Sequence, residues 1–134
     1  MTSLQVAAAP GEGSAEWMSR ATASSGRIYF WQGGSLWIGA GRGRTQWHAH
    51  HAHQIALAPQ GQFRFRTENG GAWTDFEAAL VPSHRAHQFE LDGIPIAHLF
   101  VEPESRAGRV LAARFGSDEV AALPVAETQP LARA

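Results

Sequence analysis

The sequence contains no cysteine, no lysine and no long apolar run. Without cysteine, the chain can form no disulfide, no thiolate metal site and no cysteine nucleophile. Its 11 basic residues are all arginines, and 12 acidic residues balance them, which gives a formal net charge of −1. Nucleic-acid-binding domains usually carry a basic excess on one face. We therefore expect no direct nucleic-acid binding by this chain.

No apolar stretch approaches the roughly 18 residues that a membrane-spanning helix needs. The N-terminus also lacks the basic start and the apolar stretch of a secretory signal. These absences predict a cytoplasmic protein that makes no contact with a membrane.

At 134 residues the chain has the size of one domain. A domain of this length buries about two-thirds of the surface of its unfolded chain, which is enough for a stable core without covalent cross-links. Residues 1–26 are rich in Ala, Ser, Gly and Thr, a composition that predicts a flexible arm. We expect a β-barrel over residues 27–102, a helical segment over 103–123 and a tail over 124–134.

Short runs of aromatic and β-branched residues alternate with turn residues from residue 27 onward. In one run Phe63 and Phe65 alternate with arginines, so the two rings are expected to face the core. Asn69-Gly70-Gly71 predicts a hairpin turn directly after this run. Further strands are expected at 27–31, 35–38, 54–58, 78–81, 87–91 and 94–101. Short strands with turns every 8–12 residues are typical of an all-β sandwich or barrel.

Two glycine-containing stretches, Gly39–Gly43 and Asp92-Gly93, are expected to be turns between strands. The first could also cradle a phosphate through backbone N–H groups. Because it lacks the lysine and the helix start of a P-loop, a turn is the preferred interpretation.

The C-terminal part of the chain has a helical pattern. Val110, Leu111 and Phe115 recur at helical spacing, and Gly116 stands where helices commonly end. A second short helix is expected over residues 117–123.

All seven histidines lie between residues 48 and 98. If the most histidine-rich stretch is a strand, alternation places His48, His50 and Gln54 on one face. His51 and His53 then lie on the opposite face. Two imidazoles two residues apart can converge on one ion, and imidazole suits Zn, Cu, Fe or Ni.

A third metal ligand would come from a neighbouring strand, where His87 is the best placed candidate. The alternative is that these histidines form hydrogen bonds across the barrel without an ion. The pair His51 and His53 is a less favoured metal site, because it faces away from the expected pocket. His84 and His98 are expected to be structural or surface residues.

The histidine-rich stretch resembles the first sequence motif of the cupin superfamily, here Gly43-x4-His48-x-His50-x3-Gln54-x6-Gly61. Gln54 stands where the family usually has Glu. Pro82-x-His84-x2-His87 is similar to the second motif, with His84 in place of its usual glycine.

This resemblance implies a double-stranded β-helix, or jelly-roll, barrel with a pocket at one mouth. It also implies that His48, His50, Gln54 and His87 occupy the metal-ligand positions. A divalent transition metal such as Zn, Ni, Fe or Mn would then be the cofactor.

Over residues 27–123 the chain also resembles the N-terminal sensing domain of AraC-type transcription regulators. The resemblance is carried by residues 47–54, by residues 79–82 with His87, and by residues 100–111. It implies a homodimer that senses a small-molecule effector. Such regulators carry two helix-turn-helix units after the sensor, and we expect none within this sequence.

Three functions stay open at this point. In an effector-sensing domain, Trp37, Trp47, Phe63 and Phe65 would line an apolar ligand pocket. A small metal-dependent cupin enzyme, of dioxygenase or isomerase type, would use the ion as a Lewis acid. The third possibility is a dimerising barrel without a ligand. A hydrolase triad has no support, because the sequence has no Gly-x-Ser-x-Gly elbow.

Overall fold

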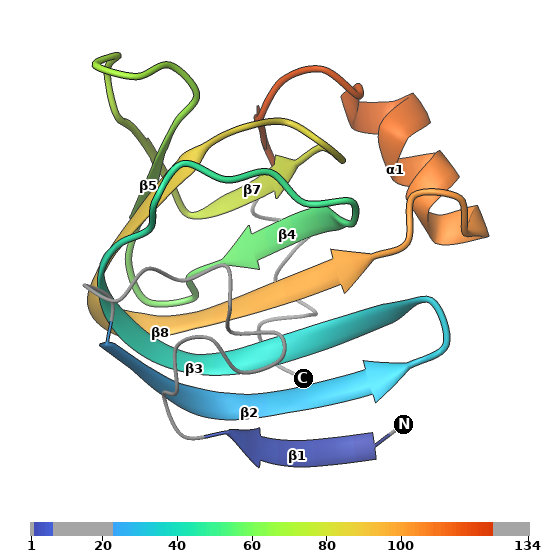
Figure 1. Ribbon diagram of the computed structural model, residues 1–134, viewed down its shortest axis with the longest axis horizontal. Coiled ribbons are helices and arrows are strands. Elements are labelled where there is room, and N and C mark those ends of the chain that lie inside the picture. The colour runs from blue at the N-terminus through green and yellow to red at the C-terminus, as the bar shows by residue number, and fades with distance from the viewer. Residues whose placement is uncertain (1, 7–22, 125–134) are drawn as a thin grey trace.

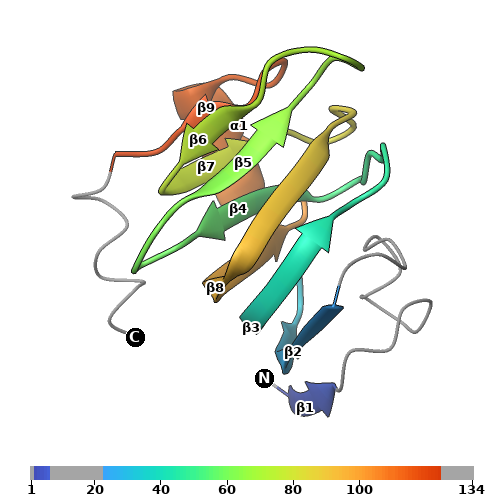
Figure 2. The same cartoon turned by 90° about the vertical axis from the view of Figure 1, so that its left-hand side faces the viewer.

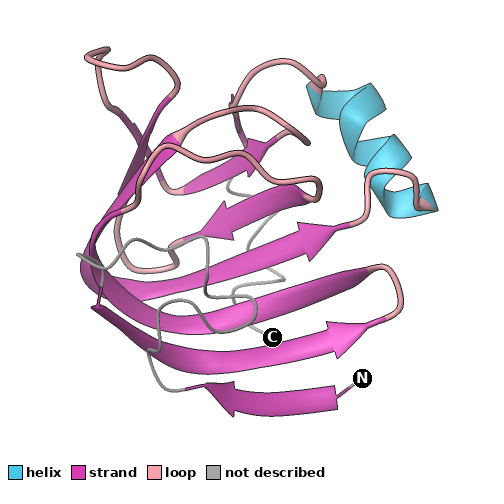
Figure 3. Cartoon of the chain, viewed as in Figure 1, coloured by secondary structure: helices cyan, strands magenta, loops and turns pink. Residues whose placement is uncertain are grey.

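Antiparallel strands make up most of the structure, and a single helix accompanies them (Figures 1 and 3). The computed structural model describes residues 2–6 and 23–124. Its strands are β1 (Thr2–Val6), β2 (Ala23–Trp31), β3 (Gly34–Arg44), β4 (His53–Leu57), β5 (Phe63–Arg66), β6 (Thr74–Phe76), β7 (Ala78–Val81), β8 (Gln88–Val101) and β9 (Ala121–Ala122), and its helix is α1 (Arg106–Phe115). The expected all-β jelly-roll fold with a short C-terminal helix is confirmed.

The strands form one nine-stranded sheet in the order β1-β2-β3-β8-β4-β7-β9, and β5 joins β8 and β6. The sheet curves strongly around its interior, as Figure 2 shows. β8 is the central strand of this sheet, with three partners. It pairs with β3 along one edge and with both β5 and β4 along the other. Side chains from the two halves of the sheet therefore meet across one interior.

Two apolar clusters stabilise the fold on opposite faces of β4, β7 and β8. The larger fills the interior and includes Trp37, Phe63, Phe65 and Phe89. The smaller lies under α1, where Leu111 and Phe115 pack against residues such as Ile55, Leu57 and Leu80. Because both faces of β4 are covered, all of its residues are buried.

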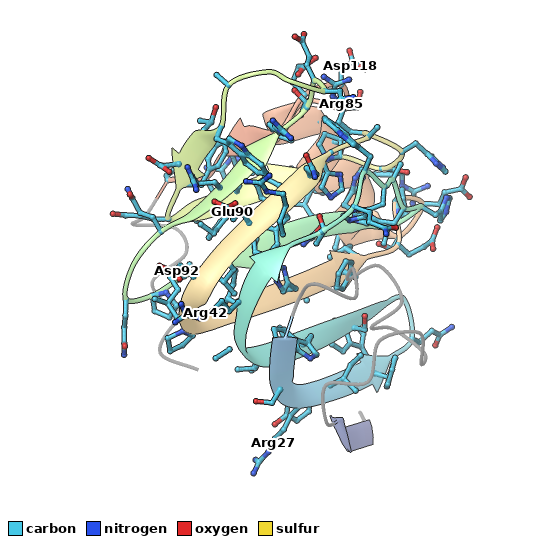
Figure 4. All side chains as sticks on the ribbon, turned by 60° about the vertical axis from the view of Figure 1, so that its left-hand side comes forward. Arg27, Arg42, Arg85, Glu90, Asp92 and Asp118 are labelled. Carbon is cyan, nitrogen blue, oxygen red and sulfur yellow. The ribbon has the colours of Figure 1, made fainter. Side chains whose placement is uncertain are left out.

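The two expected glycine turns are wrong. β3 runs through Gly39–Gly43 and β8 runs through Asp92-Gly93, and the two strands pair along this length. The register shifts between Ala40 and Arg42, and Gly93 has a φ of 79° that other residues rarely adopt. Glycine here lets two long strands bend instead of ending them. An exposed ion pair between Arg42 and Asp92 lies on this segment (Figure 4).

Other local expectations have mixed outcomes. The turn at residues 69–71 does connect two paired strands, β5 and β6. Helix α1 is capped by the Ser105 side chain, which accepts from the N–H of Gly108, and it ends at Gly116 as expected. The expected second helix over residues 117–123 is wrong, because Ala121 and Ala122 of this segment form β9, which pairs with β7.

The expected N-terminal arm over residues 1–26 is not uniform. Residues 2–6 form β1, which pairs with β2, and β2 already begins at Ala23. Residues 7–22 and most of the expected tail lie outside the described residues. Within the described part of the chain, no helix is long and apolar enough to cross a membrane.

Candidate metal centre

The histidine-rich stretch is a loop that is hydrogen-bonded to the residues directly before β8. Placing these side chains by alternation required a strand across residues 48–54, and the structure does not meet this condition, because β4 begins only at His53, close to the expected strand over 54–58. Instead, His48 and His87 form an isolated antiparallel bridge, with backbone hydrogen bonds of 3.1 and 2.9 Å. Just before the loop, Thr45 accepts from the N–H of Phe89 through its Oγ1 at 2.9 Å. These bonds fix the loop where it faces the interior of the sheet.

Three of the predicted ligands converge where this loop meets the residue before β8. One ligand nitrogen each of His48, His50 and His87 lies within 4.8 Å of the other two. The ring centroids of His48 and His87 are 4.3 Å apart, and that of His50 lies 5.7 and 5.2 Å from them. Among residues 2–6 and 23–124, no other group of three or more His, Asp or Glu side chains converges in this way. His87 was the sequence candidate for the third ligand, and it is the residue that the fold brings to the pair.

The ring orientation of all three histidines is set by the backbone. A carbonyl oxygen can only accept, so a ring nitrogen facing one must carry the proton. Each Nδ1 donates to the carbonyl of a residue two positions away: His48 to Gln46 at 2.8 Å, His50 to Ala52 at 2.9 Å, and His87 to Arg85 at 2.7 Å. In the neutral rings the lone pairs are therefore on the three Nε2 atoms.

Burial favours the neutral, metal-binding form of His87 and His48. Burial, with smaller contributions from neighbouring histidines, lowers the pKa of His87 to about 3. Burial also lowers the pKa of His48 below its ordinary value. The Nε2 atom of His87 is buried and has no hydrogen-bond partner among the described residues. A buried nitrogen lone pair of this kind is costly unless something binds to it.

Gln54, the fourth predicted ligand, contacts one of the three rings, that of His50. Its side chain is almost fully buried at the start of β4, and its Oε1 is 2.8 Å from Nε2 of His50. Its amide nitrogen donates to Nδ1 of His98 at 2.7 Å. Gln54 therefore connects His50 to a fourth histidine, His98, which is fully buried.

His98 is the residue of this site that the sequence interpretation missed, since it was expected to be structural or on the surface. It is fully buried on β8, and burial lowers its pKa to about 3. Its ring contacts Trp37, Phe89 and Phe100 at centroid distances of 5.7, 5.2 and 6.3 Å. The period-two pattern of Ile96, His98 and Phe100 could have revealed that His98 shares a face with core residues.

The expected pocket residues have different positions. Trp37, Phe63 and Phe65 are buried in the main cluster, and the Phe65 ring lies 5.5 Å from that of His87. Trp47 instead lies 5.9 Å from the guanidinium of Arg66, outside that cluster. A cavity of about 340 Å³ adjoins Phe65 and is also lined by Arg66, Thr67, Ala72, Thr74, Phe76, Glu119 and Val120.

The remaining histidines form a separate group outside the three-ring cluster. His51 is exposed, donates through Nε2 to Glu102 at 2.9 Å and contacts His84 at 3.1 Å. His53 accepts from the N–H of Ser83 through Nδ1, so that nitrogen is already used. His51 and His53 therefore do not form a paired site.

The residues of the centre fit a divalent transition metal. Three neutral imidazole nitrogens suit zinc, iron or nickel, and each carries the backbone hydrogen bond that metal-binding histidines usually make through their second nitrogen. An amide oxygen stands in the fourth position. Since all four donors are neutral, they would leave the charge of a divalent ion uncompensated, and a bound ion would act as a strong Lewis acid.

Comparison with known proteins gives only distant likenesses. No protein-family model and no curated protein matches the sequence. An RmlC-like cupin from Shewanella frigidimarina is 18% identical over 63% of this chain and 76% of its own, with a TM-score of 0.46. A cupin-like protein from Thermotoga maritima is 14% identical, over 69% and 77% of the two chains, with a TM-score of 0.48. Oxalate decarboxylase from Bacillus subtilis, a protein with Mn(II) centres, is 15% identical over 70% of this chain and 33% of its own, with a TM-score of 0.48. Likenesses at this level assign neither a ligand nor an activity.

Proposed function

We propose that this chain is a cupin-type binding domain with a divalent transition metal at its centre. His48, His50 and His87 hold the ion through their Nε2 atoms, and Gln54 completes the set through Oε1. A small molecule with metal-binding oxygen atoms occupies the remaining coordination positions. The observation that carries this proposal is the convergence of three rings whose Nδ1–H groups are all bound by backbone carbonyls.

Binding without turnover is the preferred role, in line with the effector-sensing function that the AraC-type resemblance implies. Among the described residues, no Asp or Glu side chain is buried. The described interior therefore offers no carboxylate as a general acid or base for turnover. The cavity beside Phe65 has the volume of a small-molecule site and supports the same role.

A metal-dependent enzyme of dioxygenase or isomerase type is the second candidate. It is favoured by the neutral donor set, because an ion without an anionic ligand polarises a bound oxygen more strongly. In this case the chain contributes the four ligands and the surrounding apolar walls, while the ion supplies the Lewis acidity.

Metal content tests the proposed centre. The protein is purified without a nickel column, and its metals are measured by elemental mass spectrometry. The His48→Ala/His50→Ala double variant should lose nearly all of the metal. The His51→Ala/His84→Ala variant is the matched control, because it removes two neighbouring histidines outside the cluster and should retain the metal. Equal metal contents in both variants, or no uptake of added Zn²⁺ by the wild-type protein, would refute the proposal.

The metal-loaded protein then separates the two roles. A small-molecule screen by thermal shift should identify a stabilising compound that mass spectrometry recovers unchanged after long incubation. Conversion of that compound by the wild-type protein, and not by the His48→Ala/His50→Ala variant, would favour the enzyme instead.

A further inference from the structure

The half-buried His50 and the buried Gln54 and His98 form a continuous chain of hydrogen-bonding groups. Oε1 of Gln54 lies 2.8 Å from Nε2 of His50, and its amide nitrogen lies 2.7 Å from Nδ1 of His98. Gln54 and His98 are 1% and 0% exposed. Their hydrogen-bonding partners are therefore set by the protein itself.

One contact in this chain joins two acceptors. Nδ1 of His50 donates to the carbonyl of Ala52, so Nε2 of the neutral ring carries a lone pair. That lone pair faces Oε1 of Gln54, which also only accepts. Two lone pairs at this distance repel unless a cation lies against both. Two ligands of the same metal ion show this arrangement.

The other end of the amide has one consistent assignment. The amide nitrogen of Gln54 only donates, so Nδ1 of His98 must accept and the proton of the neutral His98 ring must be on Nε2. The tautomer of His98 and the direction of the Gln54 amide are therefore linked, because reversing one requires reversing the other.

We propose that His98 is a positioning residue for the metal centre, which keeps the oxygen of Gln54 directed towards the ion. This inference rests on the proposed metal site. When the metal is removed, the Gln54 amide turns over and donates to His50, and His98 moves its proton from Nε2 to Nδ1 to donate to Oε1. The number of protons is the same in both states.

The same linkage gives glutamine a specific role at position 54. A carboxylate only accepts, so it could not be held by a lone pair on His98 and would require the Nδ1–H tautomer. The Nε2–H tautomer of His98 matches an amide, which offers a donor on one side and an acceptor on the other. The pair Gln54–His98 thus specifies a neutral fourth ligand.

Zinc affinity of matched variants tests the positioning role, measured by competition with a coloured chelator. His98→Leu fills the core with an apolar side chain and removes Nδ1, the acceptor for the Gln54 amide. This variant should bind Zn²⁺ about 10- to 100-fold more weakly. His98→Asn places an amide oxygen near the position of Nδ1 and should restore affinity to within about twofold of the wild-type protein. In a Gln54→Ala background, His98→Leu should change the affinity by no more than about twofold, because its partner is gone.

The tautomer of His98 can be measured directly in the wild-type protein, so this test does not depend on the folding of a variant. In a protein with ¹⁵N-labelled histidine, NMR distinguishes a protonated ring nitrogen from one with a lone pair. Nδ1 of His98 should carry a proton in the chelator-treated protein and a lone pair after addition of one equivalent of Zn²⁺.

The outcomes separate this inference from the proposed function. If wild-type protein binds Zn²⁺ while His98→Leu binds it equally well, or if the His98 tautomer is the same with and without Zn²⁺, the positioning role is wrong and the metal centre stands. If the wild-type protein binds no Zn²⁺, the proposed metal centre fails, and this inference fails with it.

Discussion

At the scale of single residues, the chemistry of the candidate centre depends on which ring nitrogens carry protons. Backbone carbonyls place the protons of His48, His50 and His87 on Nδ1, so all three lone pairs converge. The spacing of the histidines in the sequence indicated the ligand types. The positions of the backbone carbonyls that orient the rings could not be predicted from it. Nor did it indicate His98, whose role depends on its contact with Gln54 across the interior.

Gln54→Glu tests the neutral fourth ligand. A carboxylate in place of the amide adds a negative charge beside the proposed ion, so Zn²⁺ affinity should increase at least about tenfold, or 1.4 kcal/mol. Isothermal titration calorimetry on both proteins measures the difference. Unchanged affinity would indicate that the side chain at position 54 does not touch the metal.

The buried histidines also predict how stability depends on pH in the metal-free protein. The folded-state pKa of His98 is lowered to about 3, whereas in the unfolded chain it is about 6.5. Below pH 6.5 the unfolded state therefore binds a proton that the folded state does not. Each such histidine lowers the free energy of unfolding by about 1.4 kcal/mol per pH unit as the pH falls from about 6.5 towards 3, and contributes no slope above 6.5.

Urea unfolding of chelator-treated protein between pH 7.5 and 5 measures this slope. His87 should contribute in the same direction, since its pKa is lowered to about 3 as well. His98→Asn should reduce the slope by about 1.4 kcal/mol per pH unit. A variant with the wild-type slope would show that His98 is protonated in the folded protein.

At the scale of secondary structure, long curved strands and one clamped loop position the site. Runs of aromatic and β-branched residues between turn residues revealed most strands, and period-two alternation revealed β5. The same reasoning failed at Gly39–Gly43 and at Asp92-Gly93, where glycine bends paired strands and does not end them. Alternation predicts the faces of the histidines only if their stretch is a strand, whereas residues before β4 form a loop whose shape depends on contacts with residues about 40 positions away, such as the bridge between His48 and His87.

Thr45 is predicted to couple this loop to β8. Its side chain is 2% exposed, and its Oγ1 accepts from the buried N–H of Phe89. Thr45→Val keeps the shape but leaves that donor without its acceptor, so the free energy of unfolding should fall by about 1–3 kcal/mol. Ser105→Ala, which removes the cap of α1 and leaves the Thr45–Phe89 hydrogen bond intact, serves as the control. Only Thr45→Val should also weaken Zn²⁺ binding, and an equal effect of both variants on zinc would contradict the coupling.

At the scale of the whole molecule, the number of short strands predicted an all-β sandwich or barrel and the cupin resemblance implied the jelly roll, while the site required distant segments to meet. The centre combines the loop before β4, the start of β4, and both ends of β8. Binding at such a junction stabilises the folded state as a whole. The homodimer implied by the AraC-type resemblance stays a prediction, which light scattering coupled to size-exclusion chromatography measures.

Metal binding should therefore raise the stability of the whole domain. With free Zn²⁺ at 100 times its dissociation constant, the free energy of unfolding should increase by about 2.7 kcal/mol. Urea unfolding with and without Zn²⁺ measures this gain. The His48→Ala/His50→Ala variant should show no comparable gain, and a similar gain in that variant would place the zinc elsewhere.

The most direct test of the central claim is anomalous diffraction from zinc-loaded crystals, recorded on both sides of the zinc absorption edge. We predict one strong anomalous peak within bonding distance of the Nε2 atoms of His48, His50 and His87, with Oε1 of Gln54 beside it. A peak at the exposed pair His51 and His84, or no peak among the three converging rings, would contradict the account.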